Sequence, residues 1–228
     1  MRTQTVGCFV LPILLYGLSV ALPQARTSDA PKLTIEVTLE LKQGNEWQRT
    51  DPSTVFHRND EIRFRFRSSR GGHLYVLNRN SDGHSTWLYP RPAEGQRSRV
   101  EPGPDYLVPG TKGSFIVGGA PGFDITYWIL SPASIETREG EKPAFGSQPS
   151  TLEPRCRTEI LKSRGLCMDD RAGPGPITRL DDAPLKVLLS TPLVSRELTF
   201  QTHDGSTRIS SMDAQSDIVV YEFRIAHN

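Results

Sequence analysis

Apolar and polar residues alternate along several stretches of this chain with the period of a β-strand. The longest such stretch, residues 32–41, places an apolar residue at every second position: Leu33, Ile35, Val37, Leu39 and Leu41. Residues 61–67 repeat the pattern, with three apolar residues separated by arginines. Because successive strand side chains point to opposite faces, both stretches predict strands that bury one face and expose the other.

The residues that follow predict a hairpin. Gly71-Gly72 is typical of a turn, and residues 74–77 are an unbroken apolar run, as in a strand covered on both faces. Asp82-Gly83 favours a tight reversal. The return strand, residues 86–89, stops at Pro90, whose nitrogen cannot donate to a sheet ladder.

Further strands are predicted at residues 106–108, 114–117, 124–130, 185–189, 198–202 and 218–226. In the third of these, Ile125, Tyr127 and Ile129 share a face. Trp128 is out of phase with them, so we expect it to be the most exposed aromatic residue. The stretch near the C-terminus alternates clearly, and we expect it to pair into the main sheet.

Proline, glycine and charged residues dominate residues 131–183. Within them, residues 153–164 have helical spacing, with Cys156 and Ile160 on one face and Gly165 placed to cap the end. The eighteen prolines and nineteen glycines of the whole chain favour many short strands over long helices. The predicted fold is an all-β antiparallel β-sandwich with one short helix in a Pro/Gly-rich excursion.

The N-terminus has the pattern of an export signal. Arg2 precedes an apolar run over residues 6–22, and Ser19-Val20-Ala21 is a small-x-small cleavage site. The run is short for a membrane span, which needs about 20 residues, and an uncleaved anchor is the alternative. We expect a periplasmic or extracellular protein with a signal peptide at 1–21, a flexible lead-in at 22–31 and a single domain at 32–228.

Export also accounts for the odd number of cysteines. Cys8 would leave with the signal, and no cysteine near the cleavage site could carry a lipid anchor. Cys156 and Cys167, separated by ten residues, are then expected to form a disulfide that pins the 131–183 segment. The alternatives are two free thiols or a metal pair, although the gap does not suit the usual Cys-x₂₋₄-Cys spacing of zinc sites.

The net charge excludes some partners. Removing residues 1–21 takes away Arg2 and lowers the formal charge from +1 to zero. A neutral chain gives no electrostatic reason to expect a nucleic acid or an anionic membrane surface as a partner. After cleavage of the signal we expect no insertion into the membrane.

Candidate chemistry is sparse. His73, His84 and Asp82 could supply three metal ligands, but Asp82 is expected at the opposite end of the hairpin from His73. The chain has no Gly-x-Ser-x-Gly motif, and its two Asp-Asp pairs lie in the Pro/Gly-rich segment, where they should be solvated. We therefore predict no catalytic, cofactor-binding or metal-binding residues and no enzymatic activity.

Aromatic residues give the best functional hint. If Trp87, Tyr89 and Trp128 are exposed on a β-sandwich, they could stack on sugar rings or anchor a protein partner. The alternative is that these side chains fill the core. The arginines of residues 61–70 could likewise form a basic patch or an ordinary solvated strand face.

Residues 56–131 also resemble the bacterial domain-of-unknown-function family 4384. The resemblance lies in residues 61–66, Gly72-His73-Leu74-Tyr75-Val76-Leu77-Asn78, Asp82-Gly83, Leu88-Tyr89-Pro90, residues 103–109 and Ala120-Pro121-Gly122. His73 stands where the family usually has Tyr, and Arg91 stands where it often has Asn. The resemblance implies a β-rich domain of an exported bacterial protein. The family's motifs are structural, so the resemblance implies no site residues.

These observations predict a non-catalytic exported module of the bacterial envelope with a binding or structural role. Its partner would be an unknown protein or glycan of the envelope. The alternative is a glycan-binding module that uses exposed Trp and Tyr, and the third hypothesis is a small secreted hydrolase.

Overall fold

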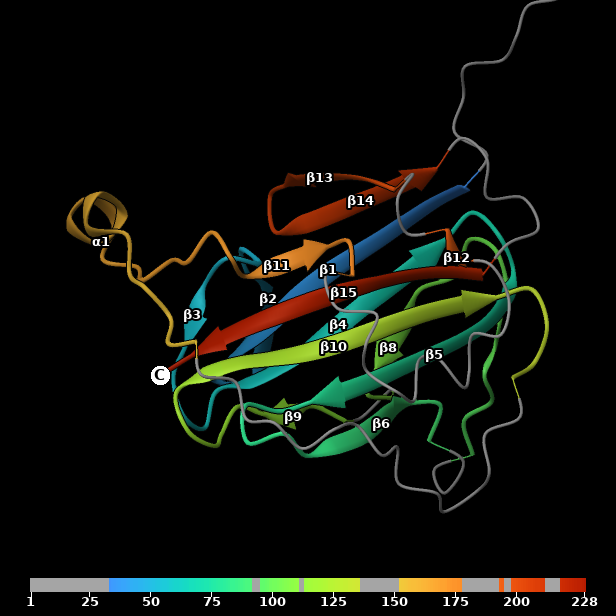
Figure 1. Cartoon of the computed structure of the whole chain (residues 1–228), viewed down its shortest axis with the longest axis horizontal. Coiled ribbons are helices and arrows are strands. Elements are labelled where there is room, and N and C mark those ends of the chain that lie inside the picture. Colours follow the sequence, from blue (N-terminus) through green and yellow to red (C-terminus); the bar gives the residue numbers. More distant parts are fainter. Residues whose placement is uncertain are drawn as a thin grey trace, which may run out of the picture.

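The computed structural model describes residues 33–91, 95–110, 113–135, 152–177, 193–194, 198–211 and 218–228. These residues form two β-sheets that pack face to face, and one short helix lies away from them (Figure 1). Nearly all strand pairs are antiparallel, which confirms the predicted all-β sandwich.

The first sheet has the strand order β13-β14-β1-β4-β8, with β2 also paired to β1 and β9 to β4. Its strands are β1 (Leu33–Gln43), β2 (Glu46–Arg49), β4 (Glu61–Ser68), β8 (Tyr106–Val108), β9 (Phe115–Ile116), β13 (Thr199–His203) and β14 (Ser206–Ser211). The long alternating stretches of the sequence are thus β1 and β4, and they are neighbours. Two strands of this sheet, β2 and β14, were not predicted.

The second sheet has the order β11-β15-β10-β5-β6, with β12 and β3 also paired to β15 and β7 to β5. Its strands are β3 (Val55–Phe56), β5 (Gly72–Arg79), β6 (Ser85–Tyr89), β7 (Arg99–Val100), β10 (Gly122–Ser131), β11 (Gly173–Gly175), β12 (Leu193–Val194) and β15 (Ile218–His227). The C-terminal strand β15 lies inside this sheet, as predicted.

Trp128 lies in the core between the sheets, and the prediction that it is exposed was wrong. Its ring is 0% exposed and meets Phe64 of the opposite sheet edge-on, with ring centroids 5.1 Å apart. It also stacks on Phe66 and on Tyr221, both at 5.8 Å. The prediction failed because both faces of β10 are covered, so alternation alone could not say which face meets the other sheet.

Two described residues of the Pro/Gly-rich segment, Ile135 and Ile177, belong to a cluster on the outer face of β10. Tyr127 and Ile129 form a second apolar cluster there, with Ile177 and the partly buried Ile135. The Tyr75 hydroxyl accepts a hydrogen bond from the Ile135 N–H at 2.8 Å, which ties the segment to the sheet. Part of the excursion therefore belongs to the domain core.

The helix α1 (Thr158–Arg164) is shorter than the predicted range of 153–164. It begins later because the Arg157 N–H, which would bond the carbonyl of residue 153 in the predicted helix, donates to the Met168 carbonyl instead. Gly165 caps the helix at φ 68°, as predicted. The predicted Cys156–Cys167 disulfide is present and closes the loop that contains α1.

Some predictions fall outside the described residues. These are the signal peptide and lead-in at 1–31, the solvated Asp181-Asp182 pair and the strand at 185–189. Among the residues that the structure does describe, no helix is long and apolar enough to span a membrane.

Candidate functional site

The outer side of the first sheet carries most of its charge. Apolar side chains of β1 and β4 face the core, so the intervening polar residues point away from it. We call the outward side of β1, β2, β4 and β14, together with Asp105, the charged face. Its ionisable residues are Glu36, Glu40, Lys42, Arg49, Glu61, Arg63, Arg65, Arg67, Asp105 and Arg208.

Glu40 is the centre of the charged face. It lies on β1 with Arg49 of β2 as register partner on one side and Arg63 of β4 on the other. The residue is 5% exposed, and its carboxylate accepts hydrogen bonds from Arg63 Nε at 2.6 Å and from Arg65 Nε and Nη2 at 3.0 and 2.9 Å. Both carboxylate oxygens are therefore occupied by β4 arginines.

Asp105 extends this network beyond Glu40. Its carboxylate accepts hydrogen bonds from Arg67 Nε at 2.7 Å and from Arg65 Nη1 at 3.3 Å. The hydrogen bond from Arg67 lowers the pKa of Asp105, and the same contact raises the pKa of Arg67. The guanidinium groups of Arg65 and Arg67 are thereby fixed in place above the sheet.

Two further contacts close the ends of the face. The Arg63 guanidinium lies 4.1 Å from the centre of the Trp47 ring, so this half-buried aromatic is capped by a cation. Lys42 pairs with Glu61 at 2.8 Å, and Ser114 also donates to Glu61. These hydrogen bonds from Lys42 and Ser114 lower the pKa of Glu61.

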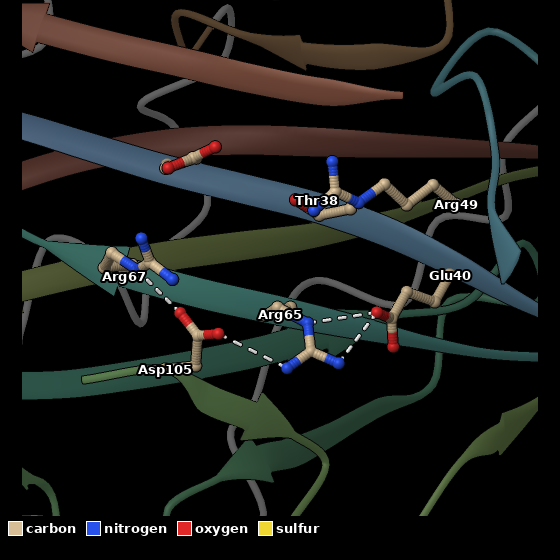
Figure 2. Close-up of a pocket in the computed structure, with 7 residues that line it drawn as sticks. Thr38, Glu40, Arg49, Arg65, Arg67 and Asp105 are labelled. Carbon is tan, nitrogen blue, oxygen red and sulfur yellow. Dashed lines mark hydrogen bonds and ion pairs between the residues drawn. The ribbon is translucent and has the colours of Figure 1, made fainter. Parts of the chain in front are cut away.

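A depression of about 280 Å³ opens in the middle of the charged face (Figure 2). It is lined by Glu36, Thr38, Glu40, Arg49, Arg65, Arg67 and Asp105. Beside it, the Ser206 hydroxyl donates to Glu36 at 3.1 Å and bonds the Thr38 hydroxyl at 3.0 Å. Every lining residue is polar, so the depression offers hydrogen-bond donors and acceptors but no apolar wall.

Arg49 differs from the other arginines that line the depression. Figure 2 shows it beside Thr38, across β1 from Arg65 and Arg67, with no bond drawn to it. Among the described residues no hydrogen bond or ion pair engages its side chain. Both oxygens of Glu40, its register partner, already accept hydrogen bonds from Arg63 and Arg65, so the Arg49 guanidinium has no counter-ion among the described residues.

The balance of charges on the face also identifies Arg49 as unpaired among the described residues. The face carries six cationic side chains and four carboxylates, an excess of two positive charges. The pairs described above use Lys42, Arg63, Arg65 and Arg67. Within the described part of the chain, Arg49 and Arg208 are the cations of this face that lack a carboxylate partner.

The aromatic residues proposed as ligand contacts do not form a common surface. Trp128 is in the core. Tyr89 is 5% exposed, its hydroxyl donates to the Arg97 carbonyl at 3.0 Å, and burial raises its pKa to about 12. Trp87 is partly buried on the other face of the second sheet, against Tyr75. An aromatic platform made by these residues is therefore contradicted.

The prediction that the Asp169-Asp170 pair is solvated was wrong for Asp169, which is 2% exposed and accepts hydrogen bonds from Arg171. Other histidines and acids also form structural contacts. His227 and Asp124 are both buried, with Nε2 and Oδ1 3.2 Å apart, and Asp124 also accepts the N–H of Ser81. His73 contacts the Ser98 hydroxyl through Nδ1 at 2.9 Å rather than Asp82 or His84. In the described ranges, no three His, Cys, Asp or Glu side chains come together as metal ligands.

The sequence predicted the cations of β4 in the charged face but not the carboxylates that pair with them. The arginines of β4 were identified as a basic run, but their carboxylate partners were not. Glu36, Thr38 and Glu40 alternate with the apolar residues of β1, so their outward position was implied by the same pattern. The pairing of β1 with β4, and the return of Asp105 to this sheet, could not be read from the pattern.

Comparison with known proteins gives one match. Residues 55–133 match the family model "Domain of unknown function (DUF4384)", which confirms the resemblance predicted for 56–131. No curated protein and no solved structure matches the chain significantly. The match includes Arg63, Arg65, Arg67 and Asp105, whereas β1, β2 and β14 lie outside it. The depression is thus built partly from residues within the match and partly from strands that flank it.

Proposed function

We propose that this protein is an exported, non-catalytic binding module of the bacterial envelope that acts in the periplasm or outside the cell. The signal-like residues 1–21 and the disulfide support export, because disulfides persist in oxidising compartments. The matched family supplies no activity of its own. The partner is a protein or a glycan of the envelope.

The charged face is the proposed binding surface. The observation that carries this proposal is the Arg49 guanidinium, which lines a depression whose other arginines are held by carboxylates. An unpaired arginine next to a rigid, hydrogen-bonded frame is suited to recognise a planar anionic group on a partner. The frame itself is held by β1 and β4, so the surface is pre-organised.

A non-catalytic role is supported by the surroundings of the reactive groups. The two described cysteines are joined in the disulfide, and the His227–Asp124 pair is sealed inside the fold. Nucleophilic catalysis needs a base beside an accessible nucleophile, and neither group offers this. Glycan binding by stacking on Trp87, Tyr89 and Trp128 is not proposed, because two of the three are buried.

Photo-cross-linking in the producing cell tests the surface. A benzoylphenylalanine at Gln201, which is exposed and shares a row of the sheet with Arg208 and Glu36, should form an adduct. The same group at Lys162 on α1 is the matched control and should form none. Arg49→Glu should reduce the adduct at position 201. Absence of an adduct at Gln201, or equal adducts at both sites, would overturn the assignment.

Export is tested separately by cell fractionation and N-terminal sequencing. A protein that is processed as proposed begins at Leu22 and is found in the periplasm or the medium. Cytoplasmic protein that retains Met1 or Arg2 would contradict the proposed location, and membrane-bound protein that retains residues 1–21 would point to an uncleaved anchor.

A further inference from the structure

We infer that the depression in the charged face binds a carboxylate-bearing sugar, of the uronic acid type, with its carboxylate held by Arg49 and Arg67 over Thr38. This inference rests on the proposed function, because it names the ligand class of the same surface. It does not use the aromatic residues. The donors and acceptors of the depression that are not already occupied decide which ligand it can bind.

The first anchor of the carboxylate is Arg49. Both oxygens of its register partner Glu40 accept hydrogen bonds from β4, Oε2 from Arg63 and Oε1 from Arg65. The Arg49 guanidinium therefore keeps its full set of donors for a ligand. An arginine with free Nη groups binds a carboxylate through two parallel hydrogen bonds.

Arg67 is the second anchor. Its Nε donates to Asp105 at 2.7 Å, which fixes the plane of the guanidinium. Its Nη groups are not engaged by any described residue, and its side chain is 52% exposed. Arg65, by contrast, donates hydrogen bonds to Glu40 and Asp105 through Nε, Nη1 and Nη2. It therefore contributes positive charge to the depression rather than free donors.

The other lining groups favour hydroxyls beside the carboxylate. From the described residues Glu36 receives one hydrogen bond, on Oε1 from Ser206, so Oε2 can accept a ligand hydroxyl. Thr38 adds a hydroxyl of its own. A uronic acid carries one carboxylate and several hydroxyls on one ring, which matches a depression whose lining offers both free guanidinium donors and free oxygen acceptors.

An acidic peptide fits the depression less well. Protein partners usually insert aromatic or aliphatic anchors into apolar pockets, and every residue that lines this depression is polar. The volume of about 280 Å³ is at the small end of ligand sites, which suits one ring of an oligosaccharide.

Calorimetric titration of the full mature chain with trimers of galacturonate, mannuronate and guluronate tests the inference. At least one trimer should bind, and its methyl ester, which keeps the hydroxyls but removes the charge, should bind at least tenfold more weakly. Raising the salt from 0.15 M to about 0.5 M should also weaken binding, because the contact is an exposed charge pair. Poly-L-glutamate is the peptide comparison.

Variants then locate the site. Arg49→Ala and Arg67→Ala should each weaken the trimer at least tenfold, and Arg49→Lys should recover part of the loss because it restores charge without bidentate geometry. Arg157→Ala, an exposed arginine on the disulfide loop, is the matched control and should bind like the parent. Arg49 is exposed and unpaired, so its substitution should not affect folding, which circular dichroism checks.

The inference is overturned if no trimer binds, if the methyl ester binds as tightly as the acid, or if poly-L-glutamate binds at least as tightly as the best trimer. It is also overturned if Arg49→Ala leaves trimer binding unchanged. A cross-link at Gln201 without any trimer binding would refute the sugar class and leave the proposed function standing. Failure of both experiments would refute both.

Discussion

Glu40 of β1 and Arg63 of β4 are register partners, and the Arg63 Nε lies 2.6 Å from the Glu40 carboxylate. Both side chains are largely buried although they lie on the outward side of the sheet, at 6% and 13% side-chain exposure. The charge of Glu40 is therefore neutralised by arginines of the protein itself. Glu40 holds the lining of the depression together, whereas Arg49 is available to a ligand.

Replacing Glu40 should destabilise the fold. Glu40→Ala leaves Arg63 and Arg65 without their shared acceptor, and we expect a loss of about 2 kcal/mol in the free energy of unfolding. Urea denaturation followed by tryptophan fluorescence measures it. Glu61→Gln, which breaks the more exposed pair with Lys42, is the matched control and should have a much smaller effect. Equal losses in both variants would refute the central role of Glu40.

Trp128 should be the most sensitive position of the core. Trp128→Ala removes contacts with Phe64 and Phe66 across the sandwich, and we expect a loss of about 3–5 kcal/mol. Trp128→Phe keeps an aromatic ring and should lose less. Trp87→Ala, at the partly exposed edge of the second cluster, should cost less than Trp128→Ala in thermal unfolding. The reverse order would contradict the packing described here.

The contrast between β1 and β10 explains which parts of the fold could be predicted. The apolar residues of β1 all face the core, and alternation predicted both the strand and its buried face. In β10 the residues on either side of Trp128 are also buried, because the excursion covers them through Ile135 and Ile177. Alternation then cannot distinguish the two faces of the strand. Which face of β10 meets the other sheet depends on contacts between segments far apart in the chain.

The candidate site, like the fold, could be predicted only in its local pattern. The charges of β4 and the polar positions of β1 follow from period-two patterns. Their combination into a depression depends on the register of β1 with β4 and on the position of Asp105, whose loop joins β7 to β8. The free state of Arg49 is a consequence of that register, since both oxygens of Glu40 accept hydrogen bonds from arginines of β4 and neither is left for β2.

Loss of the disulfide should loosen the α1 loop. Cys156→Ser with Cys167→Ser removes a cross-link whose chain-entropy contribution is about 2–3 kcal/mol for a loop of this length. The loop should become cleavable by trypsin at Arg157 or Lys162, while the sandwich resists. Mass spectrometry of the digests, with and without reductant, follows the cleavage. An unreduced parent that is cleaved there as fast as the double variant would contradict this expectation.

Acid should weaken the fold through Asp169. Burial alone would raise its pKa, but hydrogen bonds from the Arg171 side chain and from the N–H groups of Arg155 and Arg171 outweigh it and lower the pKa to about 2. A carboxyl with a folded-state pKa below its unfolded value of about 3.8 stabilises the protein above pH 4. That contribution, about 2 kcal/mol, is lost as the pH falls from 4 to 2.

Asp169→Asn isolates this effect, because it removes the charge while keeping the size of the side chain. We expect the variant to be less stable than the parent at pH 7 by about 2 kcal/mol, and the difference between them to shrink as the pH approaches 2. Asp170→Asn, the exposed neighbour, is the matched control and should follow the parent at every pH. Urea denaturation at pH 7, 4, 3 and 2 gives the comparison. A stability difference that stays constant across this range would show that Asp169 stabilises the fold through packing rather than through its charge.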